Sequence, residues 1–475
     1  MTRAGAAILL GLTLAALGGA SCEDPSLPMG VGGAGATATT GAGSSGQGGS
    51  AEPVEPTEAQ WARLLSLRWV DEPPPPDVTN AFADDDEAAI FGQRLFFDAR
   101  LSGPLLDNDN DGTNGALGIK GQAGRVSCAD CHIPEAWFSD TRSPGLQISL
   151  AAGWVLRRTP PLLDVGHKKL LNWDARRDTF FGQAIGVFEA PKEMNSSRYF
   201  VAHAMFEHHR SEYEAIFGPM PPLDDAARFP PLAPELAGCP HVESPAVDCE
   251  GRPGDGGIYD ALSSSDQDAV TRVAVNTGKA IEAYLRKLSC GSGRFDAWLD
   301  GDDAALSDAE KRGAILFVEQ GHCIDCHTGP RLTDDGFHNV GLKPDLVAVE
   351  FIDADDPGAL AGLTQAMIDP LNSRGQFSDG DDGRLPSFVQ GSLLGAFSTP
   401  GLRCISRRPS FFHTAQHRHL IYVIEHFNDG GHPDGFPGLS EILPLGLDDA
   451  QIDDIIAFLL SLDGPGPEAA LLAPP

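Results

Sequence analysis

Two stretches, Cys128-Ala129-Asp130-Cys131-His132 and Cys323-Ile324-Asp325-Cys326-His327, share the same order of cysteine, cysteine and histidine. Two cysteines at this spacing can form thioether bonds to the edge of one haem, and the histidine that follows can bind the haem iron. A single copy would also fit half of a zinc site or a thiol redox pair. A zinc site, however, needs further cysteine or histidine pairs at ligand spacing, and the sequence offers none that is convincing. The two copies therefore predict two covalent haem c groups, with His132 and His327 as iron ligands.

The chain is long and strongly acidic. Its 475 residues are enough for two or three domains with buried cores. The formal net charge of −33, from 67 acidic and 34 basic residues, argues against nucleic acid as a partner. Such a surface would attract a basic protein partner, although the same charge also serves solubility alone. The 55 glycines and 37 prolines indicate long irregular loops.

The first 22 residues have the pattern of an export signal. Arg3 precedes an apolar run over 4–20 that is too short and too rich in small residues for a membrane span. Gly19-Ala20-Ser21-Cys22 resembles the processing site of bacterial lipoproteins, with glycine where leucine is usual. This predicts a periplasmic protein tethered by a lipid anchor at Cys22, with ordinary cleavage nearby as the alternative. Residues 23–60, nearly all small between 30 and 50, are predicted to form a flexible tether.

Four cysteines remain after the export signal and the haem motifs: Cys239, Cys249, Cys290 and Cys404. In an oxidising compartment they can form two disulfides, with three pairings open. We favour Cys239 with Cys249, because this pair closes a short loop rich in proline. Buried free thiols are the alternative.

Hydrophobic periodicity predicts helices over 84–97, within 179–217, over 266–287 and over 448–462. Ser307 and Glu310 have the spacing of a capping box, which starts a further helix before the second haem motif. A helix thus precedes each haem motif and a loop follows it. This repeat predicts a mainly α fold with two cytochrome-c-like haem domains and long irregular loops. The N-terminal domain is expected over 61–290 and the C-terminal domain over 291–475.

Fragments around the haem motifs resemble the family of bacterial di-haem cytochrome c peroxidases and their relative MauG, which oxidises a protein substrate. The resemblance lies within residues 84–465, in the stretches 92–102, 158–163, 173–176, 183–184, 193–194, 337–341, 397–403 and 425–428. In this family the N-terminal haem reacts with peroxide and the C-terminal haem receives electrons. The resemblance therefore implies hydrogen peroxide as substrate and a small electron-donor protein, such as a cytochrome c, as partner.

The resemblance also implies roles for individual residues. His132 would ligate the iron of the peroxide-reacting haem, and His327 that of the electron-transfer haem. Trp173 would carry electrons between them, while Gln183 and Glu193 would lie on the open side of the first haem. A carboxylate there can take a proton from one peroxide oxygen and deliver it to the other. Without the resemblance, Glu193 would be interpreted as a surface residue and Trp173 as a core aromatic.

Three further charged positions are candidates for binding. Asp174 and Arg176 are expected to form an ion pair that fixes the loop of Trp173, and Arg176 to reach a haem propionate. Asp164 stands where the family has a calcium-binding asparagine, so it is a candidate calcium ligand. The run Asp107-Asn108-Asp109-Asn110-Asp111-Gly112 has the start of a calcium loop, but Gly118 replaces the closing glutamate. A solvated acidic turn is the alternative for this run.

Two departures from the family pattern concern the iron ligands. Many relatives close the first haem with a histidine after the motif, but none occurs between His132 and His167, so this haem is expected to be open. At the second haem, Phe427 stands where relatives have methionine or tyrosine, and a phenyl ring cannot bind iron. His426 is adjacent, but relatives with tyrosine share it, so we assign it no role. Without methionine the potential of this haem should fall.

These features favour a peroxidase over two alternatives. One is a MauG-like oxidase acting on a protein or organic substrate, which Phe427 favours. The other is a non-enzymatic electron-transfer cytochrome or haem sensor, which the missing histidine and Glu193 argue against. The sequence fixes no oligomeric state, and a homodimer is a candidate.

Overall fold

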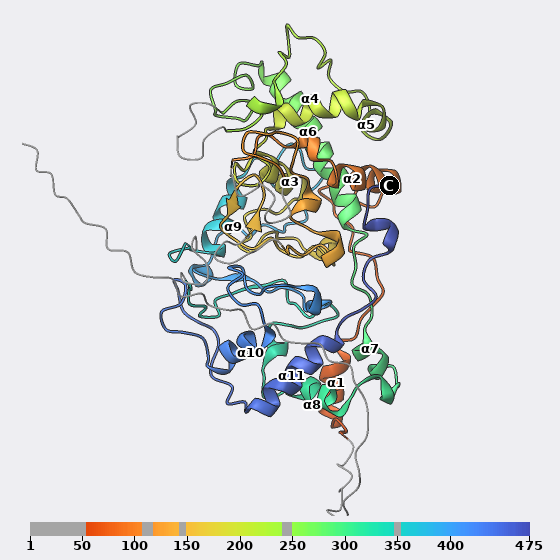
Figure 1. Cartoon of the computed structure of the whole chain (residues 1–475), viewed down its shortest axis with the longest axis vertical. Helices are drawn as coiled ribbons and strands as arrows, with labels where there is room; N and C mark the ends of the chain where they lie inside the picture. Colours follow the sequence, from red (N-terminus) through yellow and green to blue (C-terminus); the bar gives the residue numbers. More distant parts are fainter. Residues whose placement is uncertain (1–53, 107–116, 142–148, 240–248, 346–352) are drawn as a thin grey trace, which may run out of the picture. The chain divides into compact units, whose positions relative to one another are not determined.

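The computed structural model describes residues 54–106, 117–141, 149–239, 249–345 and 353–475. Helices dominate these ranges (Figure 1): α1 (Glu58–Leu65), α2 (Asp86–Phe96), α3 (Phe180–Glu189), α4 (Arg198–His208), α5 (Arg210–Phe217), α6 (Ser264–Leu285), α7 (Arg294–Leu299), α8 (Asp308–Val318), α9 (Ala359–Ile368), α10 (Leu420–Asn428) and α11 (Asp449–Ser461). Two antiparallel pairs of short strands join β1 (Ser149–Leu150) to β2 (Trp154–Val155) and β3 (Phe337–His338) to β4 (Phe397–Ser398). The mainly α fold is confirmed. Within the described ranges, no helix has the length and apolar character needed to cross a membrane.

The helix predictions agree with the structure where local signals are strong. The Ser307 side chain accepts a hydrogen bond from the backbone N–H of Glu310, and the Glu310 carboxylate caps Ser307 in return, so the capping box of α8 is confirmed. The predicted helical region 179–217 is divided into α3, α4 and α5. α3 ends at Glu189 because the residue before Pro191 is held in an extended conformation.

The first hydrophobic core surrounds α6. This helix of 22 residues packs against α2, α3 and α4. Its apolar face is fully or almost fully buried: Val270, Val273, Ala274, Ile281, Tyr284 and Leu285. Leu371 and Phe377, from the C-terminal half of the chain, also pack into this core. The core therefore joins segments from both halves of the sequence.

The second core lies between α8 and α11 and includes α7. α1 also belongs to it, since the rings of Trp61 and Trp298 are 4.8 Å apart and Leu64 is fully buried. Residues 58–60, expected to be tether, form the first turn of α1, which Thr57 caps. The boundaries at 61–290 and 291–475 stay a prediction, and the structure adds that α1 packs with the second core.

The segments 164–189 and 404–428 follow the same course. Each begins with a short 3-10 helix, η5 (Val165–His167) or η10 (Ile405–Arg407), passes through a tight loop and ends in a helix, α3 or α10. Left-handed residues recur at equivalent positions, as in Asp164 and Cys404 or Asn172 and Phe412. Trp173 and His413 are therefore equivalent residues of an internal repeat.

An equivalent pair of backbone hydrogen bonds joins each repeat to the segment that precedes the other. The N–H of Ser398 donates to the carbonyl of Trp173 at 2.8 Å, and the N–H of Arg158 donates to the carbonyl of His413 at 2.7 Å. The rings of Trp173 and His413 are 6.4 Å apart at this junction. This symmetry supports the expected pair of related haem units.

Two disulfides link the remaining cysteines. The favoured pair Cys239–Cys249 is confirmed, and Cys290 pairs with Cys404. Cys404 lies in the second repeat at the position equivalent to Asp164, while Cys290 follows α6. This second disulfide therefore fastens the connection between the two cores to the second repeat.

Candidate functional site

The two haem motifs have the same backbone geometry. Each forms a 3-10 turn, η3 (Cys128–Asp130) or η8 (Cys323–Asp325). The N–H of His132 donates to the carbonyl of Cys128 at 2.9 Å, and that of His327 to Cys323 at 2.8 Å. None of the four motif cysteines forms a disulfide. Both motifs thus present two thiols and one imidazole from a single tight turn, as covalent haem attachment requires.

The two histidines are prepared for iron binding. Burial lowers the pKa of both His132 and His327 to about 4, so each ring is neutral near pH 7. Nδ1 of His327 donates to the carbonyl of Leu332 at 2.9 Å. This bond fixes the tautomer and leaves the lone pair of Nε2 for a metal.

A cavity of about 740 Å³ opens beside His132. It is lined by the predicted residues of the first haem site: Cys128, Cys131, His132, Asp164, Trp173, Arg176, Gln183 and Glu193. Cys323, Cys326 and His327 do not line it. The structure therefore brings the residues predicted for the first haem site together around one cavity.

Two arginines in this cavity, buried Arg158 and half-buried Arg408, carry a charge that burial disfavours. Arg158 is 2% exposed, and its Nε and Nη2 have no hydrogen-bond partner. Burial lowers the pKa of Arg158 to about 10, and burial together with Arg158 lowers that of Arg408 to about 9. Buried guanidinium groups are costly unless an anion pairs with them. The carboxylates of haem propionates fit this need, so the residues present fit a haem.

Neither arginine is among the site residues predicted from the sequence. Arg158 opens one of the fragments shared with the family, and Arg408 lies in the second repeat. Only the fold shows that they share a buried cavity, because their separation along the chain gives no such signal.

Glu193 and Gln183 are placed for proton transfer and hydrogen bonding. Glu193 is half-buried at the cavity wall. Burial raises the pKa of its carboxyl, against the opposing charges of Arg176 and Arg177. The Gln183 carbonyl accepts a hydrogen bond from Nδ2 of Asn172 at 2.6 Å. The amide N–H groups of Gln183 can therefore donate hydrogen bonds to a ligand.

The loop of Trp173 is rigidly held. The indole N–H of Trp173 donates to the carbonyl of Arg158 at 2.7 Å, and the side chain is 7% exposed. The expected ion pair of Asp174 with Arg176 is confirmed at 3.2 Å, and Arg157 pairs with the same carboxylate. Burial tends to raise the pKa of Asp174, but the two arginines bring it below its usual value.

The described surroundings of Asp164 give no cluster of acidic side chains for a calcium ion. Its buried carboxyl accepts hydrogen bonds from Ser289 and from the backbone of Cys290, and the charges of Arg331 and Arg403 act on it. Among the described residues, it joins no group of three or more acidic, histidine or cysteine side chains able to hold a metal. Calcium at Asp164 stays a prediction without structural support. The acidic run over 107–112 lies outside the described residues.

Among the described residues, one group of three side chains could hold a metal ion by its spacing: Cys326, Asp334 and His338. Cys326 belongs to a haem motif, and both ring nitrogens of His338 are occupied, by Asp334 at 2.8 Å and Glu441 at 2.7 Å. The group is therefore an ion-pair cluster beside the second haem motif.

At the second haem, Phe427 lies on α10 at the position equivalent to Val187 of α3. Val187 lines the cavity of His132. His426 is engaged elsewhere, since its Nε2 donates to the carbonyl of Val340 at 2.8 Å. The repeat thus supports the alignment of Phe427, while its place opposite His327 stays a prediction.

The mature protein should carry two covalent haems. We expect its mass to exceed that of the polypeptide by two haems, and a variant with Cys323→Ala and Cys326→Ala to retain one. Mass spectrometry of the denatured protein measures both, because thioether bonds survive unfolding. A mass with a single haem in the unmutated protein would contradict the assignment.

Comparisons with known proteins agree with this site. A family model described as di-haem cytochrome c peroxidase matches residues 86–233. The methylamine utilization protein MauG of Methylorubrum extorquens is 28% identical over 379 residues, covering 79% of this chain and 78% of MauG. The cytochrome-c peroxidase IdrP2 of Denitromonas iodatirespirans is 24% identical over 396 residues, covering 82% of this chain and 84% of IdrP2.

The fold also matches a solved structure. The crystal structure of the diheme peroxidase BthA from Burkholderia thailandensis aligns with a TM-score of 0.57 and 21% identity, covering 84% of this chain and 93% of BthA. Together with the two haem motifs and the cavity at His132, these likenesses show that the chain is similar to di-haem cytochrome c peroxidases and to MauG.

Proposed function

We propose that this protein is a periplasmic di-haem peroxidase that reduces hydrogen peroxide to water at the haem of His132. The reaction consumes one peroxide, two electrons and two protons, and forms two waters. The observation that carries the proposal is the cavity in which Glu193 and Gln183 accompany His132. The bound haem supplies the redox-active iron at which the O–O bond is cleaved.

The side chains of the cavity supply the proton chemistry and the binding. The Glu193 carboxylate takes the proton from one peroxide oxygen and delivers it to the other, which becomes water. The amide N–H groups of Gln183 orient the peroxide by hydrogen bonding. Arg158 and Arg408 would hold the carboxylates of the haem edge, which would also neutralise the charges of these two arginines.

Trp173 is proposed to carry electrons to this site. It lines the cavity, contacts the ring of His413 in the second repeat, and accepts a backbone hydrogen bond from Ser398, which precedes that repeat. Electrons would enter at the haem of His327 from a small donor protein such as a cytochrome c. The net charge of −33 favours a basic donor through long-range attraction.

A MauG-like oxidation of a protein or organic substrate is the second candidate, and Phe427 favours it. Without methionine, the reduction potential of the second haem should fall, so a simple relay of electrons from a cytochrome c is less favourable. A lipid anchor at Cys22 is proposed to hold the protein at a membrane surface. A homodimer stays a prediction.

Steady-state peroxide consumption with reduced cytochrome c tests the function. We expect cytochrome c to be oxidised in a 2:1 ratio to peroxide, and the variant with Cys323→Ala and Cys326→Ala to lose this turnover while peroxide still alters the spectrum of the first haem. If peroxide alters both haems of the unmutated protein but no donor cytochrome is oxidised, the MauG-like function is supported instead.

A further inference from the structure

Glu193 lies in a short loop that is closed at both ends. Arg198 forms two hydrogen bonds with the Glu189 carboxylate, at 2.7 and 2.9 Å, and so ties the end of α3 to the start of α4. Within the loop, the N–H groups of Glu193 and Asn195 both donate to the carbonyl of Ala190, at 3.1 and 3.0 Å. The backbone thus turns back on itself at Glu193.

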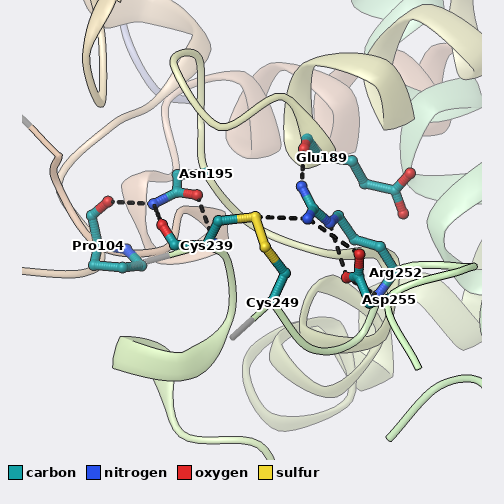
Figure 2. Close-up of a disulfide and its surroundings, with 7 residues drawn as sticks. All are labelled: Pro104, Glu189, Asn195, Cys239, Cys249, Arg252 and Asp255. Carbon is teal, nitrogen blue, oxygen red and sulfur yellow. Dashed lines mark hydrogen bonds and ion pairs between the residues drawn. A yellow bond between two sulfur atoms is a disulfide. The ribbon is translucent and has the colours of Figure 1, made fainter. Parts of the chain in front are cut away.

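The side chain of Asn195 fastens this loop to two other segments. It is fully buried, and its backbone is left-handed with φ of 46°. Its amide donates to the carbonyls of Pro104, at 2.8 Å, and Cys239, at 3.0 Å. Its carbonyl accepts from the N–H of Cys239 at 2.9 Å (Figure 2). Asn195 therefore bonds to both backbone groups of Cys239.

The backbone of Asn195 is held equally closely. A Cβ atom added at Gly103 or at Gly238 would lie 1.8 Å from the Asn195 carbonyl oxygen. Only glycine allows such an approach, so two segments pack directly on this carbonyl. The preceding carbonyls are also bonded, that of Met194 by Gly103 at 3.0 Å and that of Glu193 by Ala152 at 2.8 Å.

The Cys239–Cys249 disulfide belongs to the same network of contacts around Asn195. Arg252 donates to the sulfur of Cys239 at 2.6 Å and to the carbonyl of Glu189 at 2.9 Å, and it pairs with Asp255 at 3.0 Å (Figure 2). The disulfide-bonded segment is therefore connected both to Asn195 and to the end of α3.

We propose that Asn195, anchored by the disulfide-bonded segment at Cys239, is a positioning residue that sets the place of the Glu193 carboxylate over the first haem. This inference rests on the proposed role of Glu193 in peroxide cleavage. On this inference, the segment between α5 and α6 is a rigid support behind the acid/base residue.

A double-mutant cycle tests the proposal. We expect Asn195→Ala to lower peroxide turnover about tenfold to 10²-fold, since misplacing a catalytic group by about 1 Å can cost 10²-fold. In a Glu193→Gln background the same change should cost less than about twofold, because the group it positions is already gone. The rate at which peroxide reacts with the first haem is measured by stopped-flow absorbance, with haem content as a check.

Asn339→Ala provides the matched control. Asn339 is also buried, and its amide donates to two backbone carbonyls, those of Leu394 and Pro437, while its carbonyl accepts one N–H, that of Gly341. The change should lower the unfolding temperature by a similar amount and leave the reaction of peroxide with the first haem within about twofold.

A second variant keeps Asn195 and removes its anchor. Cys239→Ser with Cys249→Ser should lower the same rate in the same direction, and again only when Glu193 is present. If Asn195→Ala or the cysteine variant slows the reaction equally with and without Glu193, or not at all, the positioning role is refuted. If Glu193→Gln alone leaves turnover intact, the proposed function fails instead.

Discussion

Replacing Glu193 by glutamine is expected to lower peroxide turnover by about 10²-fold or more while both haems remain bound, because proton transfer by a positioned side chain contributes about 10²- to 10⁴-fold. Glutamine has nearly the same shape as glutamate and can still donate hydrogen bonds, but it cannot accept and return a proton. The loss should therefore appear in kcat rather than in peroxide binding alone.

The pH profile should identify the same group. Burial raises the pKa of Glu193 above that of an exposed glutamate, so the ionised base is lost at a higher pH as the solution is acidified. The charges of Arg176 and Arg177 limit this rise. We expect turnover of the unmutated protein to fall on the acid side, and this limb of the profile to be absent from Glu193→Gln.

Glu207→Gln is the matched control, since this exposed glutamate lies on α4 away from the cavity. It should leave both turnover and its pH profile unchanged. Stopped-flow and steady-state rates across pH give the comparison. Turnover in Glu193→Gln within about threefold of the unmutated protein would remove Glu193 from the mechanism.

The parts of the fold that could be predicted are formed by residues close to one another in the sequence. The haem motifs are single tight turns, and the capping box of Ser307 and Glu310 spans one turn of helix. The periodicity of α6 marks its buried face because each buried residue lies three or four positions from the next. Such patterns predict structure without knowledge of distant contacts.

The missed parts depend on contacts between distant segments. Trp61 packs on Trp298, so α1 joins the second core although it precedes the first haem motif. The charges of Arg158 and Arg408 meet only in the folded chain. The residue types of Trp173 and His413 do not reveal that the two positions are equivalent. Their equivalence lies in the shared path of the backbone.

The candidate catalytic side chains were predicted from the family resemblance and not from chemistry visible in the sequence. A glutamate after Pro191 has the composition of a surface loop. What makes Glu193 a candidate acid/base is its place at the cavity of His132 and the support of its loop by Asn195. Both follow from the packing of residues 103, 152 and 239 on that loop.

Phe427→Met is expected to convert the second haem to a low-spin state with a higher reduction potential. The repeat places Phe427 of α10 where α3 has Val187, a residue that lines the cavity of His132. This equivalence supports the prediction that residue 427 would face the haem iron on the side opposite His327. A methionine thioether there supplies a sixth ligand that favours reduced iron, whereas a phenyl ring supplies none.

Two effects of the phenyl ring on the potential oppose each other. An apolar ring excludes water and leaves the cationic ferric haem less well solvated, which raises the potential. The missing thioether lowers it, and we expect this ligand effect to be the larger. His426 does not compensate through Nε2, because that nitrogen is bonded to the carbonyl of Val340.

Phe427→Leu separates ligation from packing, since leucine is close to methionine in size but has no lone pair. Electron paramagnetic resonance and a redox titration of all three proteins give the spin states and potentials. We expect a low-spin signal with histidine and methionine ligation only in Phe427→Met, and a high-spin second haem in the leucine variant. If both ferric haems of the unmutated protein are already six-coordinate and low-spin with strong protein ligands, another residue binds the iron opposite His327. The alignment of Phe427 with the ligand position would then be wrong, because the phenyl ring would not face the metal.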